Sequence, residues 1–136
     1  MRAAVVLALA SIVLAGVLFG GAVISRFEAE PGLNKVTLRW TTAVESNLKG
    51  FEVERGFDGK TFQFVALVEA AGNSSAPRDY VYEDRTVFKS TGHVFYYRLK
   101  LVDFDGSFVY YDKVVSVTPQ ISNVRHTWGS IKAMFR

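Results

Sequence analysis

The chain has 136 residues, no cysteine and a formal net charge of +3 at neutral pH. This length suits one domain with short extensions, and the lack of cysteine excludes disulfides, thiolate metal sites and cysteine nucleophiles. Three basic side chains and no acidic one follow Thr118, so the other 13 of the 16 Lys and Arg balance the 13 Asp and Glu. The excess charge therefore lies on the C-terminal segment, and no basic patch in the body predicts nucleic-acid binding.

An uncharged, apolar stretch runs from Ala3 to Ile24 and follows the positive charge of Arg2. As a helix it would span about 33 Å, which is enough to cross a bilayer. It also has the pattern of a signal peptide, with small residues at 20–22 before a cleavage point. We therefore predict that residues 1–22 are a cleaved signal peptide or a retained membrane anchor helix. In both cases the segment inserts into the membrane at least transiently, and the body is exported.

Alternation of apolar and polar residues predicts β-strands between Val23 and Val117, and no stretch there has sustained helical periodicity. The first strand would place Val23, Ser25 and Phe27 on one face. The side chains expected to face the core in later strands are Val36, Leu38, Trp40, Phe51, Val53, Phe95, Tyr97, Leu99 and Leu101, with Arg55 on the same face as Phe51 and Val53. Together these patterns predict an all-β sandwich.

Two Asp-Gly pairs predict turns, at Asp58-Gly59 and at Asp105-Gly106, and the second is expected to join two long strands. On the solvent side, Arg98 and Lys100 of one strand would face outward, as would Glu52 and Glu54 of an earlier strand. Opposite charges paired across neighbouring strands contribute a few tenths of a kcal/mol each.

Three motifs together carry a resemblance to a known family: W-T-T-A-x-E-x-N at 40–47, G-F-E-V-E-R at 50–55 and Y-Y-R-L-K-x-V-D-x-D-G at 96–106. With them, residues 23–118 resemble the fibronectin type III-like module of exported Bacteroidetes- and Chlorobi-type bacterial proteins. The resemblance implies a seven-stranded immunoglobulin-like sandwich that serves as a non-catalytic spacer, adhesion or binding unit. Phe95 stands where type III domains often place the tyrosine of the tyrosine corner.

The sequence gives little support for catalysis, a metal or a cofactor, and none is predicted. His93 is interpreted as a surface turn residue, because it has no partner at metal-ligand spacing. Asp103 and Asp105 fit a β-turn better than a calcium loop, since the acids stop after two. Glu45 and Asn47 are interpreted as a pair that locks a loop by hydrogen bonding.

Paired tyrosines at Tyr96-Tyr97 and Tyr110-Tyr111 raise the alternative of a glycan platform. Adjacent strand residues point to opposite faces, so one tyrosine of each pair would be exposed. Tyr96 and Tyr110 are therefore predicted as a ligand platform, with cross-strand packing as the competing interpretation.

The segment 119–136 is predicted to be a short, basic, amphipathic tail, because Ile121, Val124, Trp128, Ile131 and Phe135 follow helical spacing. A lone helix of this length is marginal in water, so the tail needs a surface to lie on. Three remain open: its own sandwich, an anionic membrane surface, or the groove of a partner protein. A tail that is disordered until bound is a fourth interpretation. The predicted partner-binding residues are Trp128, Ile131, Lys132, Phe135 and Arg136.

Taken together, these observations predict an exported, non-enzymatic binding or assembly module of the bacterial cell envelope. It would be periplasmic, cell-surface or inner-membrane anchored, and its tail would dock on an envelope protein or on the membrane. One alternative is a single-span anchored accessory subunit of a membrane complex. Another is a carbohydrate-binding module that serves a separate enzyme.

Overall fold

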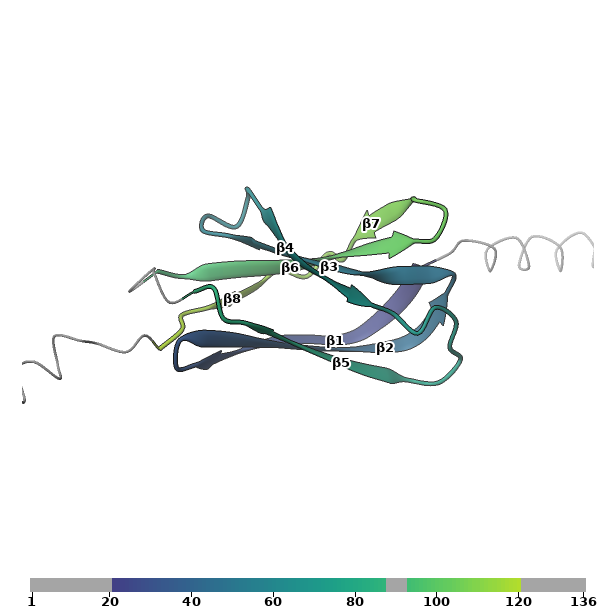
Figure 1. The fold of residues 1–136 in the computed structure, drawn as a ribbon, viewed down its shortest axis with the longest axis horizontal. Coiled ribbons are helices and arrows are strands. Elements are labelled where there is room, and N and C mark those ends of the chain that lie inside the picture. The colour runs from purple at the N-terminus through teal and green to yellow at the C-terminus, as the bar shows by residue number, and fades with distance from the viewer. Residues whose placement is uncertain (1–20, 88–92, 121–136) are drawn as a thin grey trace, which may run out of the picture.

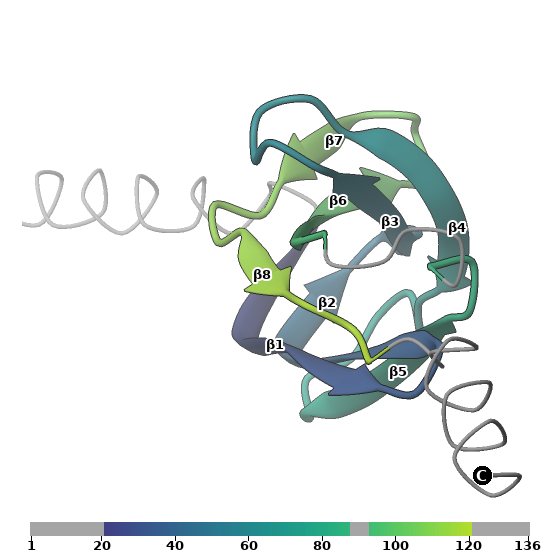
Figure 2. The ribbon, with the colours of Figure 1, turned by 90° about the vertical axis from the view of Figure 1, so that its left-hand side faces the viewer.

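The computed structural model describes residues 21–87 and 93–120, which form two antiparallel β-sheets packed face to face (Figure 1). The strands are β1 (Gly21–Gly32), β2 (Lys35–Ser46), β3 (Leu48–Gly56), β4 (Gln63–Glu69), β5 (Arg78–Asp84), β6 (Phe95–Asp103), β7 (Phe108–Tyr110) and β8 (Val115–Val117). One sheet has the order β1-β2-β5; the other has the order β4-β3-β6-β7, with β8 also paired to β6. The end-on view in Figure 2 separates the two layers. The predicted all-β sandwich is confirmed.

The described residues form eight strands, one more than predicted, because the last strand position is interrupted. Both β7 and β8 pair with β6, but residues 111–114 between them face only two residues of β6. Tyr111 instead meets Phe27 edge-on, with ring centroids 6.2 Å apart. The single long strand predicted after Asp105-Gly106 is therefore wrong, since the extra residues cannot stay in a continuous ladder.

The strand predicted from Val23 is confirmed as β1, which begins at Gly21. Its register with β2 shifts on both sides of Ile24, and Ser25 has no partner in the ladder. As a result, Ile24 and Phe27 pack on the core whereas Val23 is exposed. The common face predicted for Val23, Ser25 and Phe27 is wrong, because an irregularity of this kind reverses the alternation that follows it.

The core lies between the inner faces of the two sheets, where the alternation in the sequence predicted it. All nine apolar side chains expected there are at most 3% exposed: Val36, Leu38, Trp40, Phe51, Val53, Phe95, Tyr97, Leu99 and Leu101. Trp40 anchors the centre, stacked on Tyr80 at 5.7 Å and edge-on to Phe51 at 5.4 Å. Such offset and edge-on pairs add to the stabilisation from burial alone.

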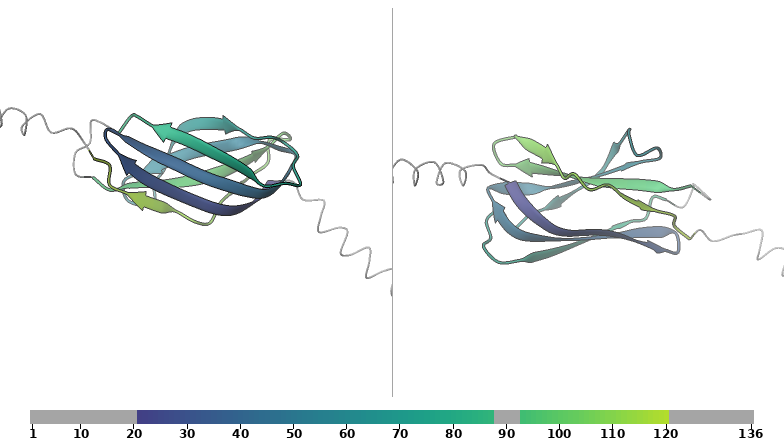
Figure 3. Two further views of the ribbon diagram at one scale, coloured as in Figure 1. Left: turned by 90° about the horizontal axis from the view of Figure 1, so that it is seen from below. Right: turned by 180° about the vertical axis from the view of Figure 1, so that it is seen from behind.

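The end of the described chain closes onto the turn between β1 and β2. The carbonyl of Gln120 accepts a hydrogen bond from the Asn34 amide at 2.6 Å, and its own amide donates to Gly32 at 3.1 Å. Since Gly21 lies at the other end of β1, the chain enters and leaves the sandwich at opposite ends (Figure 3). Within the described ranges, no helix is long and apolar enough to cross a membrane.

Candidate binding surface

The face of the larger sheet that points away from the core carries a central row of paired charges. Glu52 lies opposite Lys100 and Glu54 lies opposite Arg98 across β3 and β6, with ion-pair distances of 3.4 and 2.7 Å. The prediction that these side chains lie on the outer face and pair is confirmed, although Glu54 itself is only 8% exposed. We call this surface the outer strip and define it by Glu52, Glu54, Arg98 and Lys100 with the flanking side chains Phe62, Phe64, Leu67, Phe108 and Tyr110.

Aromatic rings hold the two cations of the outer strip from the sides. The Arg98 guanidinium carbon lies 4.2 Å from the centre of the Phe62 ring and 4.0 Å from that of Tyr110. Similarly, the Lys100 Nζ atom lies 4.0 Å from the centre of the Phe108 ring. Cation–π contacts at these distances fix both the cations and the rings in place. The side chains of the strip are therefore held in defined positions by contacts with one another.

Apolar side chains flank the charges at both edges of the sheet. On the edge strand β4, Phe64 is 61% exposed, and Leu67 beside it is also exposed. On β7, Phe108 and Tyr110 are about half exposed. These edges are three strand spacings apart, or about 14 Å. The outer strip thus combines a polar centre with an aromatic flank on each side.

The two tyrosines predicted as a ligand platform share this face of the sheet, but the structure does not bring them together. Tyr110 pairs with Lys100, four residues along β6 from Tyr96, which corresponds to about 13 Å. Tyr96 is half-buried and lies against the loop after β3, where a Cβ on Gly59 would be 3.4 Å from its ring. Of the two, only Tyr110 belongs to the outer strip.

The other predicted binding residues lie outside the described residues. These are the tail positions Trp128, Ile131, Lys132, Phe135 and Arg136. Most of the predicted signal peptide or membrane anchor, residues 1–20, lies outside them as well.

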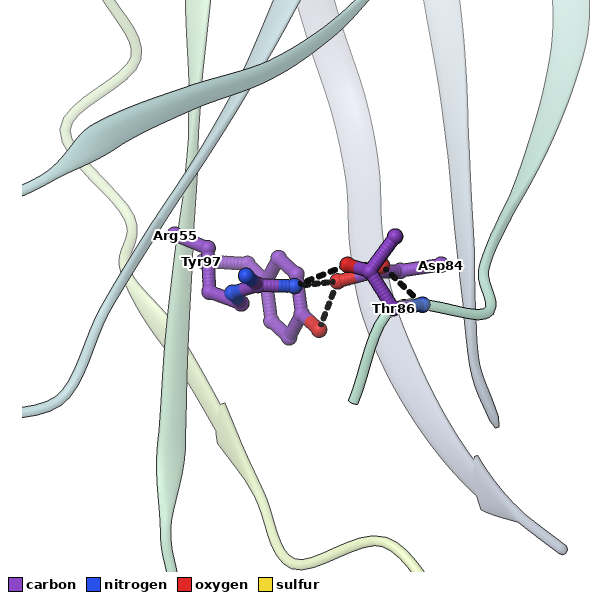
Figure 4. Close-up of polar contacts among 4 residues, drawn as sticks. All are labelled: Arg55, Asp84, Thr86 and Tyr97. Atoms are coloured by element: carbon purple, nitrogen blue, oxygen red, sulfur yellow. Dashed lines mark hydrogen bonds and ion pairs between the residues drawn. The ribbon is translucent and has the colours of Figure 1, made fainter. Parts of the chain in front are cut away.

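A second group of charges lies between the sheets and is centred on Asp84, which is fully buried (Figure 4). One carboxylate oxygen accepts hydrogen bonds from Arg55 Nη1 and from the Tyr97 hydroxyl, both at 2.6 Å. The other accepts from the amide and the hydroxyl of Thr86, at 3.0 and 2.6 Å. Burial raises the pKa of Asp84, but these hydrogen bonds outweigh burial and lower it overall. With both oxygens occupied, the carboxylate joins the two sheets and stays ionised.

Glu45 locks the loops at one end of the sandwich as predicted, but among the described residues its partners do not include Asn47, so the predicted pairing of the two is wrong. Glu45 is almost fully buried and accepts hydrogen bonds from the Thr42 hydroxyl at 2.8 Å, from the Gly72 amide at 3.2 Å and from the Tyr80 hydroxyl. Asn47 contributes through its backbone, which adopts a φ of 52°. This loop end is held by specific polar contacts.

Alkaline pH is expected to destabilise the fold through Tyr80. Burial, and then the hydrogen bond to the Glu45 carboxylate, raise the pKa of Tyr80 to about 12. An unfolded chain ionises its tyrosines near pH 10, so the contribution of Tyr80 is complete below about pH 10 and is lost as the pH rises toward 12. Urea unfolding between pH 9 and 12 should show this decline, and Tyr80→Phe should make it shallower. An unchanged slope in Tyr80→Phe would contradict the assignment.

The predicted turn residues behave as expected. Asp58 accepts hydrogen bonds from the amides of Lys60 and Thr61 at 2.9 and 2.8 Å, which forms the turn before β4. The β6–β7 turn closes through hydrogen bonds from Ser107 to Asp103 and Asp105, and Gly106 has a φ of 90°. His93 is exposed just before β6. In the part of the chain that the structure describes, no cluster of three acids or histidines could hold a metal ion.

Comparisons with known proteins agree with the fold. No family model and no curated protein matches the sequence. Among solved structures, the chain is similar to part of a β-1,2-glucanase from Parabacteroides distasonis, with a TM-score of 0.55 and 21% sequence identity. The match covers 82% of this chain but only 14% of the glucanase. This chain is thus a β-sandwich domain similar to a small part of that enzyme.

Sequence reasoning missed two sets of residues that the structure brings together. Phe62, Phe64 and Phe108 of the outer strip lie in the segments T-F-Q-F and S-F-V-Y. Alternation with polar neighbours would have placed these apolar side chains on the core face, so it indicated neither their exposure nor which cations they contact. Arg55 and Asp84 were recognisable as opposite charges on the inner faces of two strands. Inward charges rarely remain without a partner, and this was the available signal.

Proposed function

We propose that this chain is an exported, non-enzymatic binding module of the bacterial cell envelope, of fibronectin type III type. The outer strip carries the proposal, because it exposes aromatic side chains on a rigid sheet where solvent alone would favour polar ones. The strand order β1-β2-β5 and β4-β3-β6-β7 supports the type III assignment. The presence of a similar sandwich as a minor part of a β-1,2-glucanase supports an accessory role.

The tail supplies the attachment in this proposal, with Trp128 as its main anchor. A basic segment with spaced aromatic and aliphatic residues suits a partner groove or an anionic membrane surface. The sandwich itself is then free to present its outer strip. Retention of residues 1–22 would make the protein an anchored subunit, and their cleavage would leave the tail as the main means of attachment.

A chain ending at Gln120 is expected to keep the stability of the full chain to within about 0.5 kcal/mol but to lose its envelope partner. It keeps the two hydrogen bonds of Gln120 that close the sandwich, which a chain ending at Pro119 would lose. The measurement is cross-linking in cells from a photoreactive amino acid at Trp128. The matched control places the same group at Ser130, on the opposite side of the predicted helix.

Cross-links to a defined envelope protein or lipid from position 128, but not from 130, are the expected result. The proposal for the tail is wrong if both positions give the same products. It is also wrong if the full chain and the chain ending at Gln120 partition identically between membrane and soluble fractions.

A further inference from the structure

We infer that the outer strip binds a neutral polysaccharide chain that crosses the strands from β4 to β7. This inference rests on the proposed binding function and names the ligand class of that surface. Aromatic side chains stand at both edges, with Phe64 on β4 and Phe108 and Tyr110 on β7, and all three are substantially exposed. The apolar C–H face of a sugar ring packs on such rings, and the separation of about 14 Å is one that a short oligosaccharide spans.

The centre of the strip suits sugar hydroxyls. Glu52 presents an acceptor, and Arg98 and Lys100 present donors, on the sheet between the aromatic flanks, whereas Glu54 is only 8% exposed and serves mainly to hold Arg98. Each of these side chains is at least partly held by its ion pair, and each cation also by an aromatic ring. Hydrogen-bonding groups fixed in advance lose little conformational entropy when a ligand binds.

The charges also indicate that the ligand is neutral. The two carboxylates and two cations cancel in pairs, at 2.7 and 3.4 Å, so the strip has no net charge with which to attract an acidic polymer. A protein partner is a poorer match, because protein interfaces have an apolar centre and a polar rim. Here the order is reversed, with charges in the centre and aromatic rings at the edges.

The test measures binding of the full chain to insoluble polysaccharides, in a non-ionic detergent that lacks a sugar headgroup. Cellulose and curdlan serve as the neutral β-glucans, chitin as a third neutral polymer, and calcium pectate as the acidic one. We expect retention on at least one neutral polymer that is insensitive to salt. Phe64→Ala and Phe108→Ala should each weaken it roughly tenfold, the scale of losing one stacked ring.

Phe57→Ala is the matched control, because Phe57 is 57% exposed and Phe64 is 61% exposed, yet Phe57 contacts His93 and Phe95 away from the strip. It should bind as the wild type does. The inference is overturned if no neutral polymer retains the chain more than Phe64→Ala, or if Phe57→Ala weakens binding equally. Salt-sensitive retention on pectate alone would also overturn it.

Self-association through the same surface is the remaining outcome that overturns the inference. Sedimentation velocity would then show a wild-type dimer and a Phe64→Ala monomer. Failure of the polysaccharide test leaves the tail cross-links unaffected, so a wrong ligand class and a wrong binding function give different results.

Discussion

Replacing Asp84 by alanine is expected to destabilise the domain by about 3 kcal/mol at neutral pH, because it removes the buried carboxylate that pairs with the partly buried Arg55 and accepts from the buried Tyr97 hydroxyl. Asp84 accepts four hydrogen bonds, including those from Arg55 Nη1 and the Tyr97 hydroxyl. Without the carboxylate, the Arg55 guanidinium and the Tyr97 hydroxyl stay between the sheets with too few acceptors. Urea unfolding followed by circular dichroism measures the loss.

Asp79→Ala is the control for Asp84→Ala, since Asp79 is exposed on the same strand and accepts a hydrogen bond from Thr41 at 2.6 Å. It should change stability by only about 1 kcal/mol. The double variant Arg55→Met with Asp84→Leu should recover much of the loss, because it removes both charges together. Equal losses for Asp84→Ala and Asp79→Ala would show that the buried cluster adds no stability.

Acid is expected to weaken the same cluster. Burial opposes ionisation of Asp84, but the hydrogen bonds from Thr86, Tyr97 and Arg55 lower its pKa overall. A carboxyl with a lowered pKa stabilises the fold above the pKa of the unfolded chain, about 4, and this contribution is lost as the pH falls further. The stability of the wild type should therefore drop below about pH 4 more steeply than that of the double variant.

Replacing Trp40 by alanine is the other change with a large expected effect, about 3–5 kcal/mol. Trp40 is 1% exposed and packs against Phe51 and Tyr80, whose rings lie at 5.4 and 5.7 Å. The indole is the largest fully buried side chain in the described part of the chain, and its removal leaves a cavity between the sheets. Circular dichroism in urea is the suitable measurement, because the substitution itself alters fluorescence.

Trp40→Phe separates packing from hydrogen bonding. The indole N–H has no acceptor among the described residues. Phenylalanine has no such donor, so the substitution removes an unsatisfied buried N–H group. Trp40→Phe should therefore lose less than about 2 kcal/mol. Val81→Ala, an exposed position on β5, should change stability by less than about 0.5 kcal/mol. A loss for Trp40→Phe as large as for Trp40→Ala would contradict this account.

The core could be predicted from the sequence because period-two alternation decides which side chains face inward. This worked for β2, β3 and β6, whose pairing with their neighbours is nearly regular. It failed for Val23 and for the last strand position. In both places one strand has residues outside the regular ladder, at Ser25 and at 111–114, and pairing with the neighbouring strand decides which residues these are.

The outer strip was only partly predictable, for a related reason. The alternation correctly predicted that Arg98, Lys100 and their carboxylate partners lie on the outer face. The register between β6 and β7 then decided that Tyr110 lies beside Lys100 and away from Tyr96. Register depends on turns and on packing across strands, so local sequence carries little of it. The Arg55–Asp84 contact joins two different sheets and depends on the whole tertiary structure.

The chain enters and leaves the sandwich at opposite ends, so a force that pulls on both ends of the domain has a defined direction relative to the strands. A force applied between Gly21 and Gln120 would pull along the strands, over the length of the twelve-residue β1, about 40 Å. The hydrogen bonds between β1 and β2 and between β6 and β8 would then be loaded together in shear, instead of opening one after another like a zipper. A module tethered at one end and bound at the other would transmit tension through its full length and resist extension.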